Sequence, residues 1–193
     1  IEEVKQEIVR EIGKTFKTDR CFIRLYDENG VLQPADIEYL ADEKVKSIKG
    51  VFLSKYLDEY FKKIHIENKP VYAFEIEGFP EEAPINKAFK ELFKIFNIKA
   101  SYGIPIFYSG KPFGSIVLQW SDKAMLNDEE LDLLKMIANQ AGTAIEQSNL
   151  YSISQKQAQR EALLRRINET IRSSLDIEEV KQEIVREIGK TFK

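Results

Sequence analysis

The chain has 193 residues, 43% of them hydrophobic and 32% charged, which is enough apolar material for one well-packed domain. Its 29 basic and 32 acidic residues are interspersed, so we expect no nucleic-acid-binding surface. No run of eighteen apolar residues and no signal-peptide pattern occurs, so we expect no membrane segment within these residues. The single cysteine, Cys21, excludes an intramolecular disulfide and a CxxC site and favours a reducing, cytoplasmic setting.

One stretch of the sequence occurs twice. Residues 1–17 and 177–193 both read IEEVKQEIVREIGKTFK, at an offset of 176 residues. A solvated helix face tolerates many substitutions, so complete identity indicates a natural duplication or an added copy. Because 176 residues is the length of a domain, we predict one module at 1–151, a linker or signalling helix at 152–176, and the first helix of a following repeat at 177–193.

The first copy has the spacing of an amphipathic helix, with apolar side chains every fourth residue at Val4, Ile8, Ile12 and Phe16. We expect Gly13 to help end it. Residues 21–27, CFIRLYD, predict a strand closed by a turn at 27–30, and residues 35–41 predict a second strand that pairs with the first.

The middle of the chain mixes helices and strands without a βαβ rhythm. Periodicity predicts helices at 53–64 and 85–96 and a strand at 70–76, opened by Pro70. This order favours an antiparallel α+β sheet over a parallel one.

The last third begins with the clearest hairpin. Two apolar runs within residues 101–122 flank the tight-turn cluster Ser109–Pro112, and Pro105 predicts a bulge or an interruption of the ladder. Asn127 and Glu130 then form a capping-box pattern ahead of a long helix. Within that helix only the polar cluster 173–176 is typical of a break, or of a cap for the second copy.

This succession of elements resembles the GAF domain family over roughly residues 1–151. The most specific part is the final hairpin and helix, where the matching positions are Ser101, Pro105, Gly110, Gly114, Leu131, Leu134, Ala138, Gln140, Ala144, Ile145 and Glu146. The resemblance implies an α+β fold. Its central antiparallel β-sheet of about five or six strands has the N- and C-terminal helices on one face. Short helices lie over a pocket on the other face, and a long C-terminal signalling helix follows.

The resemblance also implies a non-catalytic sensory or regulatory module of a multi-domain signal-transduction protein. In this interpretation the module transmits conformational change through a dimerising helix to its neighbour in a tandem array. Any enzymatic output, such as a two-component histidine kinase or a cyclase, is expected elsewhere in the full-length protein. The alternative is a sensor that binds a small molecule, either a cyclic nucleotide or a non-covalent tetrapyrrole, and gates that output.

No cofactor is evident from the residues, and no metal site is expected. Bilin-binding relatives attach their chromophore through a cysteine that is usually followed by histidine, whereas Cys21 is followed by Phe22, so covalent bilin binding is disfavoured. His65 is interpreted as a solvated or capping residue rather than a haem ligand. For cyclic nucleotides, Asn86 and Lys87 match a family pair, but Ala124 stands where a phenylalanine belongs, so that ligand is unsupported.

Aromatic residues of the middle and of the last hairpin are candidates to line an apolar pocket for a planar ligand. The candidates are Tyr39, Phe74, Phe93, Tyr102 and Trp120. Most aromatic residues in a domain of this size belong to the core, so only a minority are expected to touch a ligand.

The residues after the domain carry a heptad-like seam that is polar at first and apolar at Leu164, Ile167 and Ile171. We predict a homodimer that pairs along this helix as a short coiled coil. The alternative is a helix that packs back on its own domain. In the second copy of the repeat, Val180, Ile184, Ile188 and Phe192 lack the sheet of the first copy and need another cover.

Overall fold

The computed structural model describes residues 2–67, 69–72, 84–122 and 126–191, and the structural statements below concern these residues. The chain divides into two compact units, Ile1–Ser148 and Asn149–Lys193, which are described separately.

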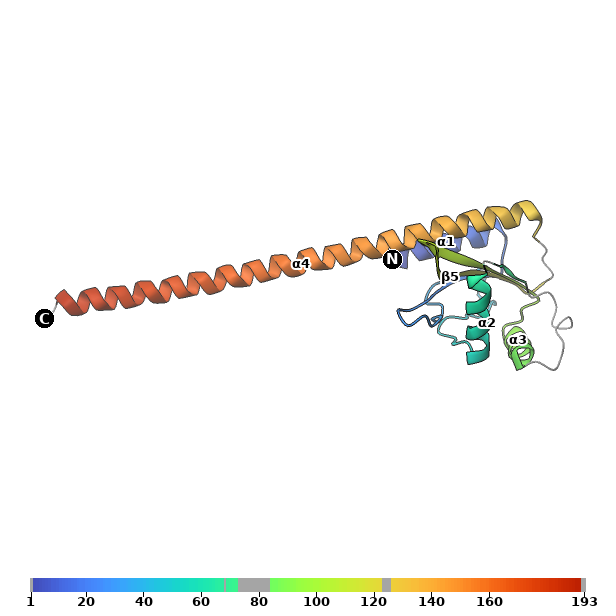
Figure 1. Ribbon diagram of the computed structural model, residues 1–193, viewed down its shortest axis with the longest axis horizontal. Coiled ribbons are helices and arrows are strands. Elements are labelled where there is room, and N and C mark those ends of the chain that lie inside the picture. Colours follow the sequence, from blue (N-terminus) through green and yellow to red (C-terminus); the bar gives the residue numbers. More distant parts are fainter. Residues whose placement is uncertain (1, 68, 73–83, 123–125, 192–193) are drawn as a thin grey trace. The chain divides into compact units, whose positions relative to one another are not determined.

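The first unit is built on one antiparallel sheet (Figure 1). Its strands are β1 (Arg20–Leu25), β2 (Glu38–Leu40), β3 (Val71–Tyr72), β4 (Ala100–Tyr108) and β5 (Lys111–Trp120), in the order β2-β1-β5-β4-β3. The predicted α+β class with an antiparallel sheet is therefore confirmed. The predicted total of five or six strands is not established, because β3 has two residues and residues 73–83, which hold the rest of its predicted strand, lie outside the description.

The β4–β5 hairpin closes as predicted. Tyr108 pairs with Lys111, and the two residues between them, Ser109 and Gly110, have φ angles of 49° and 75°. Two successive positive φ angles are typical of a type I′ turn, whose twist matches that of the strands. The irregularity predicted at Pro105 lies one step further along, where Phe107 follows Ile106 and β5 carries the extra residue. Pro105 itself stays in register with Ser115.

One face of the sheet is covered by α1 (Glu2–Thr15) and by the first part of α4 (Asp128–Thr191) (Figure 1). These helices and the inward side chains of the strands form the main core. Helix α1 ends at Thr15, two residues after Gly13, and the Gly13 carbonyl oxygen accepts a hydrogen bond from the Thr18 amide at 2.9 Å. Gly13 also lets the ring of Tyr39 approach, because a Cβ atom there would lie 2.1 Å from Tyr39 Cδ1.

The opposite face is covered by α2 (Lys55–Ile66) and α3 (Pro84–Ile95), close to the predicted helices (Figure 1). These helices share a smaller core that contains Leu57, Phe89 and Phe93. Ser54 caps α2, since its hydroxyl accepts a hydrogen bond from the amide of Leu57. The N-terminal and C-terminal helices and the short helices thus lie on opposite faces, as the resemblance implied.

The predicted capping box at the start of α4 is confirmed. The Glu130 amide donates to Asn127 Oδ1, and the Asn127 amide donates to Glu130 Oε2, each at 2.9 Å. The break predicted near residues 173–176 is absent, because α4 continues to Thr191. Ser and Asp there cost little helix propensity compared with Gly or Pro, and neither Gly nor Pro occurs between residues 143 and 188.

The second unit, taken alone, is the C-terminal part of α4. Its side chains described between residues 153 and 185 are exposed. No helix in the described part of the chain combines the length and apolar character needed to cross a membrane.

Candidate functional site

A pocket lies between the sheet and helices α2 and α3. Its floor comes from β1, β4 and β5, and its cover comes mainly from apolar side chains of the two helices. The lining residues are Phe22, Arg24, Leu32, Ile48, Leu53, Leu57, Phe61, Phe89, Leu92, Phe93, Ser101, Gly103, Ser115, Val117 and Gln119. The cavity volume is about 40 Å³, which is room for a few water molecules.

The floor of the pocket follows from the register of three strands. Side chains alternate between the faces of a sheet, so every second residue of each strand points to the pocket. The cross-strand rows on this face are Arg20–Gln119–Ser101, Phe22–Val117–Gly103 and Arg24–Ser115–Pro105. Two polar rows therefore flank one apolar row beneath the helices.

Arg24 is the charged group of this floor. Its side chain is 3% exposed, its Nη2 donates to the carbonyl oxygen of Val51 at 3.0 Å, and its Nη1 has no hydrogen-bond partner in the described part of the chain. The guanidinium also lies 5.6 Å from the ring centroid of Phe22. Burial lowers the pKa of Arg24 to about 10, so the group is still cationic at neutral pH. A buried cation with an unused donor is costly unless an acceptor reaches it.

Arg20 has a different role, although it stands four residues before Arg24 on the same face. Its Nε and Nη2 donate to the carbonyl oxygen of Lys46 at 2.9 and 2.5 Å, and its Nη1 donates to Gln119 Oε1 at 2.7 Å. These contacts use all three nitrogens. Arg20 therefore fastens the loop at Lys46 to the sheet and is not available to a ligand.

Helix α2 is held to the turn after β1 by three side chains on one of its faces. Asp58 accepts from the Leu32 amide at 3.2 Å, Lys62 donates to the Gly30 carbonyl at 3.0 Å, and His65 Nδ1 lies 2.7 Å from the hydroxyl of Tyr26. The spacing of four and three residues places all three on the same side of the helix.

The interpretation of His65 as a solvated residue is wrong. Its side chain is 0% exposed, and burial lowers its pKa to about 4, so it is neutral at pH 7. Its Nε2 has no partner in the described part of the chain. It stands one turn after Phe61, a pocket residue, and it contacts that ring at a centroid distance of 6.0 Å.

The structure divides the aromatic residues predicted to line the pocket. Phe93 lines it. Tyr39, Tyr102 and Trp120 belong instead to the core on the opposite face, beneath α1 and α4. Phe74 lies outside the described residues. Aromatic character alone did not discriminate, because the face of a strand residue depends on register, which the sequence does not show directly.

Cys21 also lies on the opposite face. It is fully buried in the core beneath α1 and α4, and burial raises the pKa of its thiol well above the usual value.

Lys87 is exposed on α3, and Asp128 and Glu129 are exposed in the first turn of α4. No cluster of three or more potential metal ligands occurs among the residues that the structure describes.

Sequence reasoning missed the polar residues of the floor. The signal was present in RCFIRL, where two arginines four residues apart alternate with apolar side chains in a strand. Such arginines point to one covered face and need acceptors there.

The predicted dimer residues lie in the second unit. Leu164, Ile167 and Ile171 are exposed by 51%, 45% and 52%. Of the second repeat copy, Val180 and Ile184 are exposed as well, while Ile188 and Phe192 lie outside the described side chains.

The GAF domain family model matches residues 1–145. No match was found among curated protein sequences. Among solved structures, a phycocyanobilin-bound GAF domain from a cyanobacterial phytochrome is similar, with a TM-score of 0.65 and 21% identity over 78% of this chain and 86% of that one.

Two further structures are similar. The far-red absorbing dark state of a protein with bound biliverdin IXa has a TM-score of 0.64 and 21% identity, over 77% of this chain and 93% of that one. A domain of a putative two-component sensor histidine kinase from Sinorhizobium meliloti has a TM-score of 0.60 and 20% identity, over 80% of this chain and 96% of that one. At this level of identity the similarity shows a shared fold.

The prediction that no cofactor is evident, with covalent bilin binding disfavoured, is contradicted by these comparisons. Similar structures include GAF domains with bound phycocyanobilin, phycoerythrobilin and biliverdin. The prediction relied on the position of Cys21 in the first strand and on the absence of a histidine beside it, and did not consider the pocket as a whole.

The antiparallel sheet with helices on both faces and the family match over residues 1–145 lead to the same conclusion. The chain belongs to the GAF domain family and is a sensory domain.

Proposed function

We propose that this GAF domain is a small-molecule sensor whose ligand binds between the sheet and helices α2 and α3. The observation that carries the proposal is Arg24, a buried cation on the pocket floor whose Nη1 has no hydrogen-bond partner among the residues that the structure describes. Sites for small molecules combine an apolar lining with a few directed polar groups. This pocket has that composition.

The ligand class that fits is a planar apolar molecule with an acidic group. The carboxylate or phosphate of such a ligand would accept from Arg24 Nη1, and Ser115 lies beside Arg24 in the same cross-strand row. Phe61, Phe89 and Phe93 offer aromatic surface above it. A linear tetrapyrrole has both features, a conjugated plane and propionate carboxylates, and similar GAF structures bind bilins. A cyclic nucleotide is the smaller alternative.

Ligand entry must enlarge the pocket. The cavity of about 40 Å³ is far below the 300 to 1,000 Å³ of a typical small-molecule site. Helices α2 and α3 form the cover, and α2 is held by side-chain contacts at Leu32, Gly30 and Tyr26. We propose that binding moves this cover outward, and that the movement is the signal.

The test is a titration of the purified chain with biliverdin and with phycocyanobilin, followed by visible absorbance. We expect saturable binding at one site per chain with a shifted absorbance band. Arg24→Gln should weaken binding by about 10- to 100-fold, the range for a lost hydrogen bond to a charged group. Arg160→Gln, on the exposed helix of the second unit, is the matched control and should bind like the wild type.

Two outcomes would contradict this proposal. One is the absence of saturable bilin binding, in which case a parallel calorimetric titration with cyclic GMP and cyclic AMP tests the alternative ligand. The other is equal affinity of wild type and Arg24→Gln.

We further propose that the domain is non-catalytic and gates a kinase or cyclase output elsewhere in the full-length protein. The exposed seam of Leu164, Ile167 and Ile171 favours transmission through paired helices of two chains. In this proposal residues 1–151 form the sensory domain and 152–176 the signalling helix, in the cytoplasm, and residues 177–193 repeat the sequence of the domain's first helix.

A further inference from the structure

The structure shows what the repeated sequence binds. In its first copy, α1, Val9 and Ile12 are 0% and 2% exposed against the core of the sheet. Lys5 is buried and forms an ion pair with Asp36. Gly13 packs on the ring of Tyr39. The sequence IEEVKQEIVREIGKTFK therefore encodes a docking face for the β1 and β2 edge of this sheet.

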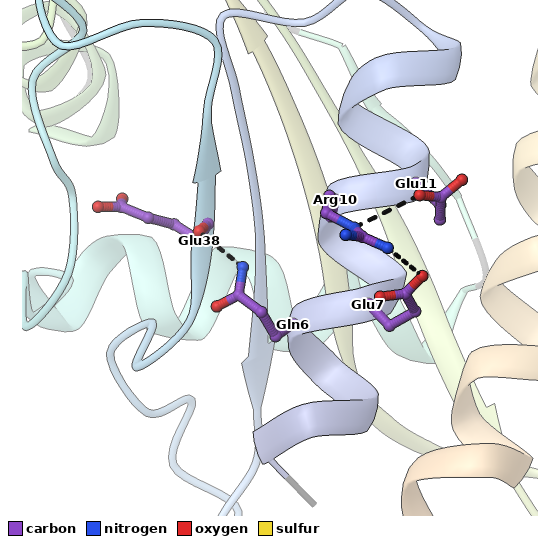
Figure 2. Close-up of polar contacts among 5 residues, drawn as sticks. All are labelled: Gln6, Glu7, Arg10, Glu11 and Glu38. Atoms are coloured by element: carbon purple, nitrogen blue, oxygen red, sulfur yellow. Dashed lines mark hydrogen bonds and ion pairs between the residues drawn. The ribbon is translucent and has the colours of Figure 1, made fainter.

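The polar side chains of α1 fall into two groups, those that contact the sheet and those that contact α1 itself (Figure 2). Gln6 Nε2 donates to the main-chain oxygen of Glu38 on β2 at 3.5 Å. Arg10 instead pairs with Glu7 and Glu11 of α1 itself and is exposed. Gln6 thus belongs to the docking face, whereas Arg10 belongs to the outer face.

The second copy carries the same face, and its described apolar side chains are exposed. Val180, Ile184 and Val185, which correspond to Val4, Ile8 and Val9, are exposed by 56%, 53% and 69%. No atom of the described part of the chain lies within 4 Å of the Cβ position at Gly189, the counterpart of Gly13.

We propose that residues 177–193 are an exchangeable α1, which docks on the sheet of a second copy of this chain in place of that copy's own α1. Lys181 and Gln182 supply the groups that reach Asp36 and Glu38 in the first copy, and Gly189 supplies the space for Tyr39. Because the two helices are identical in sequence, exchanging them preserves every contact with the sheet. The inference is independent of any ligand in the pocket.

The wild-type equilibrium favours the chain's own helix. Residues 16–19 join α1 to β1, and so short a tether gives an effective concentration on the order of millimolar. At micromolar protein the second helix therefore competes poorly. Docking should become dominant once α1 is weakened and residues 177–193 are left intact.

The repeat provides a matched test in the full chain. Val9→Asp buries a carboxylate at a fully covered position and unseats α1, whereas Val185→Asp changes an exposed residue. We expect the melting temperature of the Val9→Asp chain to rise more steeply with protein concentration than that of Val9→Asp plus Val185→Asp. The Val9→Asp chain should also sediment as a larger species than the double variant at equal concentration. Val185→Asp alone should melt like the wild type.

Equal behaviour of the single and double variants overturns the proposal, and so does the unfolding of both at all concentrations. The pair Val9→Ala and Val9→Ala plus Val185→Ala repeats the comparison with a milder change. Here too the melting temperature of the single variant should rise more steeply with protein concentration than that of the double variant.

A crosslink tests the docked position itself. In the Val9→Asp background, Asp36→Cys with Lys181→Cys should give interchain dimers with a short bis-maleimide. Asp36→Cys with Arg186→Cys, the counterpart of the outward Arg10, should give at least tenfold less. The native Cys21 is fully buried and will not compete. Equal yields from the two pairs would place the helix elsewhere and refute the assignment.

Discussion

At the scale of single residues, the informative side chains are buried polar groups that lack some of their hydrogen-bond partners. Within the described residues, Arg24 Nη1 and His65 Nε2 have no hydrogen-bond partner. Both lie at or next to the pocket between the sheet and α2. Burial that is costly for the fold is common where a protein binds a ligand.

Arg24→Met should stabilise the ligand-free domain. The substitution removes a buried, partly unsatisfied cation and keeps an apolar side chain over Phe22, so we expect the free energy of unfolding to rise by about 1–2 kcal/mol. Urea unfolding followed by fluorescence of the buried Trp120 measures it. Arg20→Met is the control and should destabilise, since Lys46 and Gln119 lose their partner. A loss of stability in Arg24→Met would argue that Arg24 is structural.

His65 should make stability depend on pH. Its pKa is about 4 in the folded protein and near 6.5 when unfolded, so between these values the unfolded chain binds more protons. Stability is therefore fully present above about pH 6.5 and falls as the pH drops toward 4, by about 3 kcal/mol in total.

Urea unfolding at pH 7.5 and 5.0, compared between wild type and His65→Gln, isolates this contribution, because His65 is the only histidine. Between these two pH values the free energy of unfolding should fall less in His65→Gln than in the wild type. The decrease that remains in the variant comes from the carboxylates. An unchanged slope would mean that His65 is accessible to protons in the folded state.

At the scale of elements, the repeat shows that one sequence serves two environments. Residues 2–15 pack on the sheet as α1, and the same sequence at 178–191 continues helix α4 in the second unit, where the described side chains are exposed. Helix formation is local, since spacing and propensity suffice for it. Burial is not local, because it requires the strands β1 and β2 to be folded beside the helix.

Glycine substitutions should separate these two contributions. Gly13→Ala places a Cβ atom on the ring of Tyr39 and should lower the free energy of unfolding by about 2 kcal/mol or more. Gly189→Ala, the same change in the second copy, meets nothing and should raise helix stability by about 1 kcal/mol. Trp120 fluorescence reports the first change, and circular dichroism at 222 nm during heating reports the second. Effects of the same sign would contradict the packing of α1 on Tyr39.

At the scale of the whole molecule, the exposed helix of the second unit is the segment through which the domain would transmit a signal to another chain. Exposed apolar residues at helical spacing in the second unit are typical of a surface that pairs with another helix.

Leu164→Glu plus Ile167→Glu should lower the mass measured by sedimentation equilibrium to that of a single chain, because charges replace apolar contacts in the paired seam. Ala162→Glu plus Ser173→Glu, on the other side of the helix, should leave the mass unchanged. A mass that does not change in the seam variant would exclude pairing through this part of α4.

The sequence by itself determined the local structure of this protein. Helix periodicity placed α1, α2 and α3, the Asn127 and Glu130 pair placed the start of α4, and Ser109 and Gly110 placed the hairpin. All of these signals act within a few residues, so they can be read from a single chain. The resemblance of the final hairpin and helix to GAF domains supplied the arrangement of layers.

Only the tertiary structure decided which side chains form the pocket. Register between β1, β4 and β5 sends Arg24, Ser115 and Phe22 to one face and Cys21, Tyr102 and Trp120 to the other. A shift of one residue would reverse every assignment, and no local signal excludes that shift. The cost of burying Arg24 and His65 likewise arises from chain segments distant in sequence. The sequence therefore predicts the scaffold, and the packing of distant segments determines the candidate site.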